Sequence, residues 1–204
     1  MLHATGLVRL CGIVAAVSLC GTAAVGAPPC NDGPVFPVLP TYETGATPDA
    51  VAVADLDGDG DPDLAVANKD GASVSVLLNR GDGLFAGQSS FAAGASPESV
   101  SAGDLNADGV VDLVVANFTS NDVSVLLGNG DGTFRTQRRS PSGLGPRWSV
   151  VGDFNNDALD DVVIVNGGDA SVSVLLGDGG GSLGLRRGRV RETNPVVTVR
   201  QQIR

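Results

Sequence analysis

A 49-residue repeat in strict register constrains this 204-residue chain more than any other feature. Acidic loops begin at Asp55, Asp104 and Asp153, and each lies 49 residues after the previous one. A fixed period of this length is typical of propellers and solenoids, in which each repeat is one supersecondary unit. The same step, without insertion or deletion, relates Pro48, Pro97 and Pro146; Asn68, Asn117 and Asn166; Leu77, Leu126 and Leu175; Gly81, Gly130 and Gly179; and Phe36, Phe85 and Phe134.

Within each repeat the apolar residues recur with the period of β-strands rather than that of helices. In the first repeat, small and β-branched residues predict strands over 50–53, 63–67 and 73–78, and turn-forming residues follow at 79–83. In the second repeat a fourth strand is expected near 133–136, after the Gly-Asn-Gly-Asp-Gly turn. A β-sandwich could use such strands, but it would not require identical spacing. The sequence predicts an all-β fold of four-stranded antiparallel propeller blades, about three repeats forming an incomplete propeller.

The two ends of the chain differ in composition from the repeats. Residues 1–27 combine Arg9, an apolar stretch and a Val-Gly-Ala cleavage site, which predicts a signal peptide and secretion, with a retained membrane anchor as the alternative. Residues 28–185 are predicted to form the repeat domain, without membrane insertion once the signal is removed. Residues 186–204 are a basic tail in which Pro195 is in phase with the repeat, so a degenerate fourth repeat, a chain cut short and a diverged tail remain open.

The charge of the repeat region favours cations as ligands. Residues 28–185 contain 6 basic and 22 acidic side chains, a net charge of −16. Such a surface repels a phosphate backbone, so no nucleic-acid partner is expected.

The acidic loops have the composition of a site for a hard cation. Each starts at position 1 with Asp55, Asp104 or Asp153, and positions 1, 3, 5 and 9 are always Asp or Asn. Alternating short carboxylates on a tight loop, with a backbone carbonyl at position 7, provide the oxygen ligands that calcium prefers. Position 12, which is a bidentate Glu in an EF-hand, is Val66 in the first loop. Because Val66 lies inside a predicted strand, the loop is expected to join two strands rather than two helices.

The Asp-x-Asp-x-Asp-Gly-x-x-Asp loop between strands, in repeats of this size, resembles the FG-GAP (VCBS) repeats of integrin α-subunit-like β-propellers. The resemblance covers about residues 36–183 and implies calcium in each loop and an extracellular setting. Propellers of that family usually close with seven blades, whereas three repeats are present here. The first loop has four anionic side chains at positions 1, 3, 5 and 9, against three and an Asn in each of the others, and in the third loop Ala158 replaces the glycine of position 6. Binding is therefore predicted to be tightest at the first site and weakest at the third. The implied ligands are Asp55, Asp57, Asp59, Asp61 and Asp63; Asp104, Asn106, Asp108, Val110 and Asp112; and Asp153, Asn155, Asp157, Leu159 and Asp161.

Three functions are compatible with these features. The first is a secreted calcium-binding adhesion or interaction module for a protein or polysaccharide ligand. The second is a structural remnant or fragment of a longer propeller. The third is the scaffold of an extracellular polysaccharide-acting enzyme, although His3 is the chain's only histidine and no catalytic constellation is expected in the mature chain.

An incomplete propeller exposes the flat faces of its first and last blades. Repeat stacks normally cap such faces, so self-association to complete a ring, or further blades, is expected. Trp148 precedes the third loop and is expected to pack in the core or at a blade interface.

Overall fold

The computed structural model describes residues 40–185. The chain divides into two units, 1–39 and 40–204, and the first lies outside the described residues. The predicted signal peptide, the tail 186–204 and the first 12 residues of the predicted repeat domain also lie outside them, so these boundaries stay predictions. The described part of the second unit folds into twelve strands and contains no helix.

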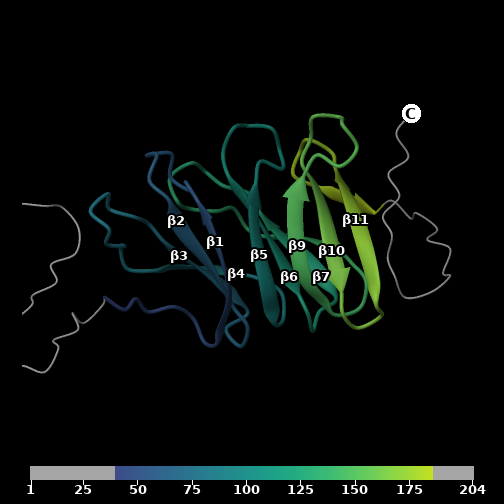
Figure 1. Ribbon diagram of the computed structural model, residues 1–204, viewed down its shortest axis with the longest axis horizontal. Coiled ribbons are helices and arrows are strands. Elements are labelled where there is room, and N and C mark those ends of the chain that lie inside the picture. The colour runs from purple at the N-terminus through teal and green to yellow at the C-terminus, as the bar shows by residue number, and fades with distance from the viewer. Residues whose placement is uncertain (1–39, 186–204) are drawn as a thin grey trace, which may run out of the picture. The chain divides into compact units, whose positions relative to one another are not determined.

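The strands form three four-stranded antiparallel sheets, one for each repeat, and each sheet follows the order of the chain (Figure 1). This arrangement confirms the predicted all-β fold of propeller-type blades in an incomplete propeller. The first sheet contains β1 (Pro48–Ala54), β2 (Asp63–Asn68), β3 (Ser73–Leu77) and β4 (Ser89–Ala92). The second contains β5 (Pro97–Gly103), β6 (Asp112–Asn117), β7 (Asp122–Leu126) and β8 (Arg138–Pro141). The third contains β9 (Pro146–Gly152), β10 (Asp161–Asn166), β11 (Ser171–Gly177) and β12 (Leu183–Leu185).

Two apolar layers hold the sheets face to face, because alternate residues of a strand point to opposite faces. Between the first and second sheets, Val74 and Val76 of β3 belong to one buried cluster with Leu113 and Val115 of β6. Between the second and third, Val114, Val123 and Val125 join Val162, Ile164 and Leu175 in a second cluster. The second sheet is therefore buried on both faces, which explains why every residue of β6 is buried.

The fourth strand of the second sheet lies later in the chain than the sequence predicted. Phe134 makes a single bridge to Gly128, and β8 begins only at Arg138, so the prediction near 133–136 was wrong for this sheet. Phe134 is 8% exposed and packs edge-to-face on Phe91, with ring centroids 5.2 Å apart, which takes its side chain into the core between the sheets. In the third sheet the equivalent pairing, Gly177 with Leu183, continues along the chain, so that residues 183–185 form β12.

Candidate metal centre

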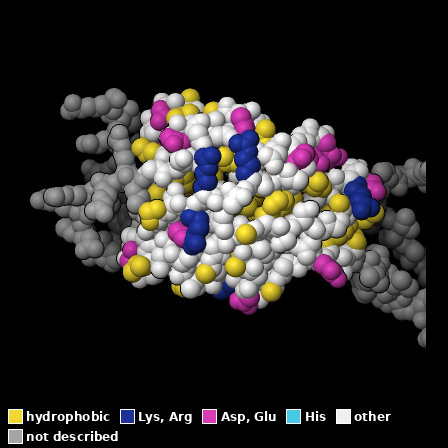
Figure 2. Space-filling model, turned by 180° about the vertical axis from the view of Figure 1, so that it is seen from behind, with side chains coloured by type: hydrophobic (Ala, Val, Ile, Leu, Met, Phe, Trp, Pro, Cys, Tyr) yellow, Lys and Arg dark blue, Asp and Glu magenta, His cyan; other side chains and the backbone are white. Residues whose placement is uncertain are grey.

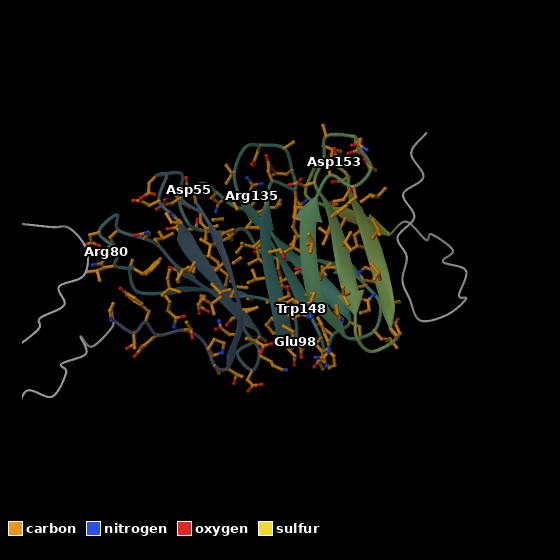
Figure 3. The ribbon with its side chains drawn as sticks, in the orientation of Figure 1. Asp55, Arg80, Glu98, Arg135, Trp148 and Asp153 are labelled. Atoms are coloured by element: carbon orange, nitrogen blue, oxygen red, sulfur yellow. The ribbon has the colours of Figure 1, made fainter. Side chains whose placement is uncertain are left out.

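Each acidic loop connects the first two strands of its sheet, as predicted. The loops follow β1, β5 and β9, and all three lie along the same edge of the stacked sheets, where Figure 3 labels Asp55 and Asp153. Because the strands run in the same order in every sheet, the repeat in sequence becomes a row of equivalent loops in space.

The first aspartate of each loop is held by the backbone of its own loop. A carboxylate oxygen of Asp55 accepts a hydrogen bond from the N–H at position 6, which belongs to Gly60, at 3.0 Å. The equivalent bonds measure 2.8 Å in the second loop and 3.0 Å in the third. The loops therefore close around the position-1 carboxylate in one common geometry.

The last aspartate of each loop anchors it to the sheet. Asp63 is fully buried, and its two oxygens accept the N–H groups of Leu56, at 2.8 Å, and Asn79, at 2.7 Å. Asp112 and Asp161 are equally buried and accept the equivalent pairs of N–H groups. Since Asn79 follows β3, this carboxylate ties the loop both to its own start and to the third strand.

The first loop brings three carboxylates together. One oxygen each of Asp55, Asp57 and Asp63 lies within 4.8 Å of the others, the only such group of three acidic, histidine or cysteine side chains among residues 40–185. Desolvation, assisted by the nearby charges of Asp63, Asp59 and Asp55, raises the pKa of Asp57 above its ordinary value. The cluster therefore concentrates negative charge that a divalent cation would neutralise.

The second loop carries less charge at the same place, because Asn106 stands at position 3. Burial raises the pKa of Asp112 to about 6, with smaller contributions from the charges of Asp108 and Asp104, against the hydrogen bonds it accepts from Gly128 and Leu105. The Asn106 amide donates to the Asp108 carboxylate at 2.8 Å. Without a cation this loop uses its own amide to offset part of the repulsion.

The third loop has the same hydrogen-bonded frame despite its alanine at position 6. Ala158 adopts φ +66°, close to the left-handed values of Gly60 and Gly109. Desolvation acts to raise the pKa of Asp153, but four backbone N–H groups, from Ala158, Asn156, Asp157 and Asn155, together lower it. The loop thus stabilises an ionised carboxylate at its centre, and does so in a backbone conformation that disfavours alanine.

The position-5 carboxylates face their own loops. An oxygen of Asp59 accepts the N–H of Asp61 at 2.8 Å, and Asp108 and Asp157 accept the equivalent groups of Val110 and Leu159. Position 5 therefore fixes the residue whose carbonyl was predicted as a ligand.

Each loop has a second left-handed residue, at position 4, that was not predicted from the sequence. Gly58, Ala107 and Asn156 have φ of +79°, +56° and +62°. Of the three residue types at this position, only Gly and Asn adopt the left-handed conformation readily, so the alanine of the second loop hid the pattern in the sequence.

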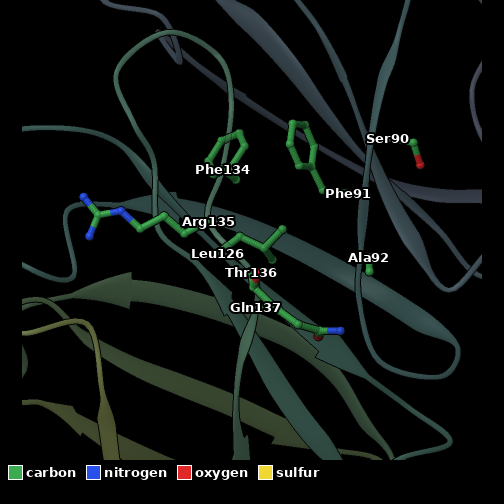
Figure 4. Close-up of a pocket in the computed structure, with 8 residues that line it drawn as sticks. All are labelled: Ser90, Phe91, Ala92, Leu126, Phe134, Arg135, Thr136 and Gln137. Carbon is green, nitrogen blue, oxygen red and sulfur yellow. The ribbon is translucent and has the colours of Figure 1, made fainter.

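An open groove lies apart from the loops, between β4 of the first sheet and the segment 134–137 that precedes β8 in the second. Its volume is about 270 Å³, and it contains both an aromatic pair and polar side chains. Figure 4 shows the rings of Phe91 and Phe134 beside each other and Arg135 extending away from them. The remaining lining residues are Ser90, Ala92, Leu126, Thr136 and Gln137.

The basic side chains of the described surface are dispersed. Figure 2 shows Lys and Arg in small separate groups on the reverse side, with acidic side chains around them. Lys69 and Arg147 both pair with Glu98, at 2.7 and 3.4 Å. On this face the basic groups do not form the continuous tract that follows a phosphate backbone.

The loop geometry and the repeated sheets agree with the family comparison. The sequence model of the FG-GAP-like repeat matches residues 55–115 and 104–164, which together span more than half of the chain. The chain belongs to the FG-GAP-like repeat family. Each match starts at position 1 of an acidic loop and ends inside the second strand of the next repeat.

The chain is partly similar to a protein of known structure. A solved structure of a lectin from Agrocybe aegerita, described for specific recognition of non-reducing terminal N-acetylglucosamine, is 27% identical with a TM-score of 0.49. The alignment covers 67% of this chain and 37% of the lectin chain, so this chain spans well under two thirds of that structure. No curated protein matches. Among residues 40–185 no helix is long and apolar enough to cross a membrane.

Proposed function

We propose that the FG-GAP-like repeats bind calcium in their three acidic loops, and that the calcium-loaded blades act as an exported interaction module. The observation that carries the proposal is the convergence of Asp55, Asp57 and Asp63 within 4.8 Å on a loop that backbone hydrogen bonds hold in place. The chemistry fits a hard cation, since every ligand is a carboxylate, amide or carbonyl oxygen.

The electrostatic repulsion within the first loop supports the proposal that it binds calcium. Two unit charges 4.8 Å apart repel by about 1 kcal/mol in water and by about 3 kcal/mol at an effective dielectric constant of 20. Three such pairs are a substantial cost for a domain whose whole stability is about 5–15 kcal/mol. A bound divalent ion replaces this repulsion with attraction, so calcium contributes to folding by mass action.

The order of affinities follows from charge and backbone conformation. The first loop has four anionic side chains at positions 1, 3, 5 and 9 and two glycines at its left-handed positions. The second and third loops each have three anionic side chains and an Asn at those positions, and the third has no glycine at position 4 or 6. We therefore expect the tightest binding at the first site and the weakest at the third.

Calorimetric titration of calcium into the chelator-treated protein tests the proposal. Asp57→Asn, which removes one charge from the cluster, is expected to weaken the tightest binding step. Asp49→Asn is the matched control, because Asp49 is an exposed residue of β1 away from the loop. An absence of calcium binding in the wild-type protein, or equal losses in both variants, contradicts the assignment.

The interaction role rests on the predicted export signal and on the open groove of Figure 4. The partly buried Phe91 in its lining offers an apolar contact, and Arg135 and Gln137 offer hydrogen-bonding groups, to a polysaccharide or protein ligand. Calcium-dependent capture of a ligand from polysaccharide panels, lost in Arg135→Ala and retained in Arg80→Ala, supports this role. If no ligand is captured while calcium still stabilises the fold, the alternative of a structural fragment of a longer propeller is favoured. Release of a polysaccharide product would instead favour the enzyme scaffold.

Export is tested separately. Mass spectrometry of the protein released by an exporting host is expected to show a mature chain that begins at Pro28.

A further inference from the structure

The third sheet presents an apolar face that residues 40–185 leave uncovered. The equivalent faces of the first two sheets are buried by the next sheet: Val74 and Val76 are at most 1% exposed, and so are Val123 and Val125. On the third sheet, Trp148 is 65% exposed and Val150 is 57% exposed, contrary to the expectation that Trp148 is packed. Trp148 pairs with Val165, which pairs with Val172, and these valines are 44% and 38% exposed. The exposed residues therefore form one continuous surface across β9, β10 and β11.

The two existing interfaces show how a following strand covers such a face. The first strand of each new sheet places one central residue against two alternate residues of the preceding first strand. In the first interface Val100 of β5 packs in the cluster that contains Ala50 and Ala52 of β1. In the second, the Ser149 hydroxyl of β9 lies 3.0 Å from that of Ser99 and 2.7 Å from that of Ser101.

The 49-residue period identifies the equivalent residues in the tail. Val100 and Ser149 correspond to Thr198, and the residues that would flank Thr198 are Trp148 and Val150. Residues 195–200, Pro-Val-Val-Thr-Val-Arg, begin with the in-phase proline and have the β-branched composition of a strand.

The turn before each first strand supplies a second, independent match. Thr47, Ser96 and Gly145 each precede the proline that starts a first strand, and their φ angles are +55°, +55° and +57°. The equivalent residue in the tail is Asn194, and Asn is one of the few residues that tolerate this left-handed conformation. Glu192 stands where the earlier repeats have Gly45, Gly94 and Gly143, so the tail does not match the repeats at that position.

Side-chain contacts also join the ends of neighbouring sheets. The residue after β2 contacts the second residue of β5 through the ion pair of Lys69 with Glu98. The equivalent contact of the next interface is Arg147 over the ring of Phe118, 4.7 Å from its centroid. The next pair in the series is Gly167 with Val196, which carries no charge and can form neither of these contacts.

The connecting segment is long enough. Nine residues lie between Leu185 of β12 and Pro195, so the two are ten Cα steps apart and can be up to about 33 Å from each other when the segment is extended. The path from the fourth strand of a sheet back over its first strand requires about 14 Å across the strands and about 10 Å to the next layer.

We propose that residues 195–200 pack on the outer face of the third sheet as the first strand of a fourth blade, with Thr198 between Trp148 and Val150. This covering strand goes beyond the calcium-binding role. The chain's own tail is favoured over a second copy because a short tether holds it at an effective concentration in the millimolar range.

Trp148 is the only tryptophan in the chain, so its fluorescence reports directly on this face. Because alternate strand residues point to opposite faces, the proposed strand would turn Val196 and Thr198 toward the third sheet and Val197 and Val199 away from it. In the full-length protein at low concentration we expect a blue-shifted emission and weak acrylamide quenching. Thr198→Asp and Val196→Asp are expected to shift the emission to the red and to increase quenching, while the matched controls Val197→Asp and Val199→Asp leave both unchanged. Circular dichroism of each variant confirms that the three sheets remain folded.

Two results would overturn the proposal. Equally strong quenching in the wild-type protein and in Thr198→Asp would show that Trp148 stays exposed. Shielding that appears only as protein concentration rises, together with a larger species in sedimentation, would assign the face to a second copy of the chain. Neither result depends on calcium binding, so the two proposals fail independently.

Discussion

The position-6 residue of the acidic loops offers a direct test of how the backbone holds these sites. Ala158 adopts φ +66° so that its N–H reaches the Asp153 carboxylate at 3.0 Å. We predict that Ala158→Gly stabilises the protein, and that Gly60→Ala and Gly109→Ala destabilise it.

The magnitude follows from the backbone alone. A left-handed conformation costs an L-residue roughly 1–2 kcal/mol, and the greater freedom of glycine in the unfolded chain offsets about 0.4–1 kcal/mol of the gain. The net stabilisation expected for Ala158→Gly is therefore about 0.5–1 kcal/mol, or roughly 1–4 °C in Tm for a protein of this size. A Cβ at Gly60 or Gly109 would meet no atom within 4 Å, so the opposite changes should cost about as much through conformation and not through a clash.

Urea unfolding and thermal melts in excess chelator measure these effects without a contribution from bound cations. The three variants should bracket the wild type, with unchanged urea m-values. A lower stability for Ala158→Gly, or an equal or higher stability for Gly60→Ala and Gly109→Ala, would refute the claim that position 6 is strained in the third loop and relaxed in the first two.

Three further outcomes are expected. Because folding raises the pKa of Asp112 from 3.8 to about 6, the folded apo protein binds more protons than the unfolded chain between these pH values, so its stability should fall by up to about 3 kcal/mol as pH rises through this window. The Tm measured from pH 4 to 7 in chelator should therefore decline, and saturating calcium should flatten that decline. A rising Tm of the apo protein would contradict this prediction. Asp63→Ala leaves two backbone N–H groups without an acceptor and should lower the free energy of unfolding by about 2–5 kcal/mol even in chelator. Asp59→Ala, which loses one exposed hydrogen bond, is the control, and an equal loss of stability in both variants would contradict the anchoring role of the buried Asp63. Calcium at 100 times its Kd should raise the stability of the wild-type protein by about 2.7 kcal/mol for one site, and a melting point unchanged by excess chelator would remove the main support for the metal assignment.

The acidic loops show how the sequence specifies a local site. Positions 1 and 9 are Asp in all three repeats, and the structure uses them identically, one to close the loop and one to anchor it to the sheet. A loop of nine residues is governed by local hydrogen bonds and backbone preferences, so its composition was sufficient to predict its place between two strands. The sequence also predicted Asp55, Asp57 and Asp63 as ligands of one cation, and the structure brings their oxygens within 4.8 Å of one another.

The repeat period and strand alternation by themselves determined the all-β class and the number of sheets, since both properties follow from periodicity along the chain. Tertiary structure decided what periodicity cannot express. Phe134 left the predicted strand because the core between two sheets buries its ring against Phe91. Trp148 has the sequence context of a buried residue, yet it is exposed on the last described sheet, because burial depends on which surface lies opposite and not on the residue alone.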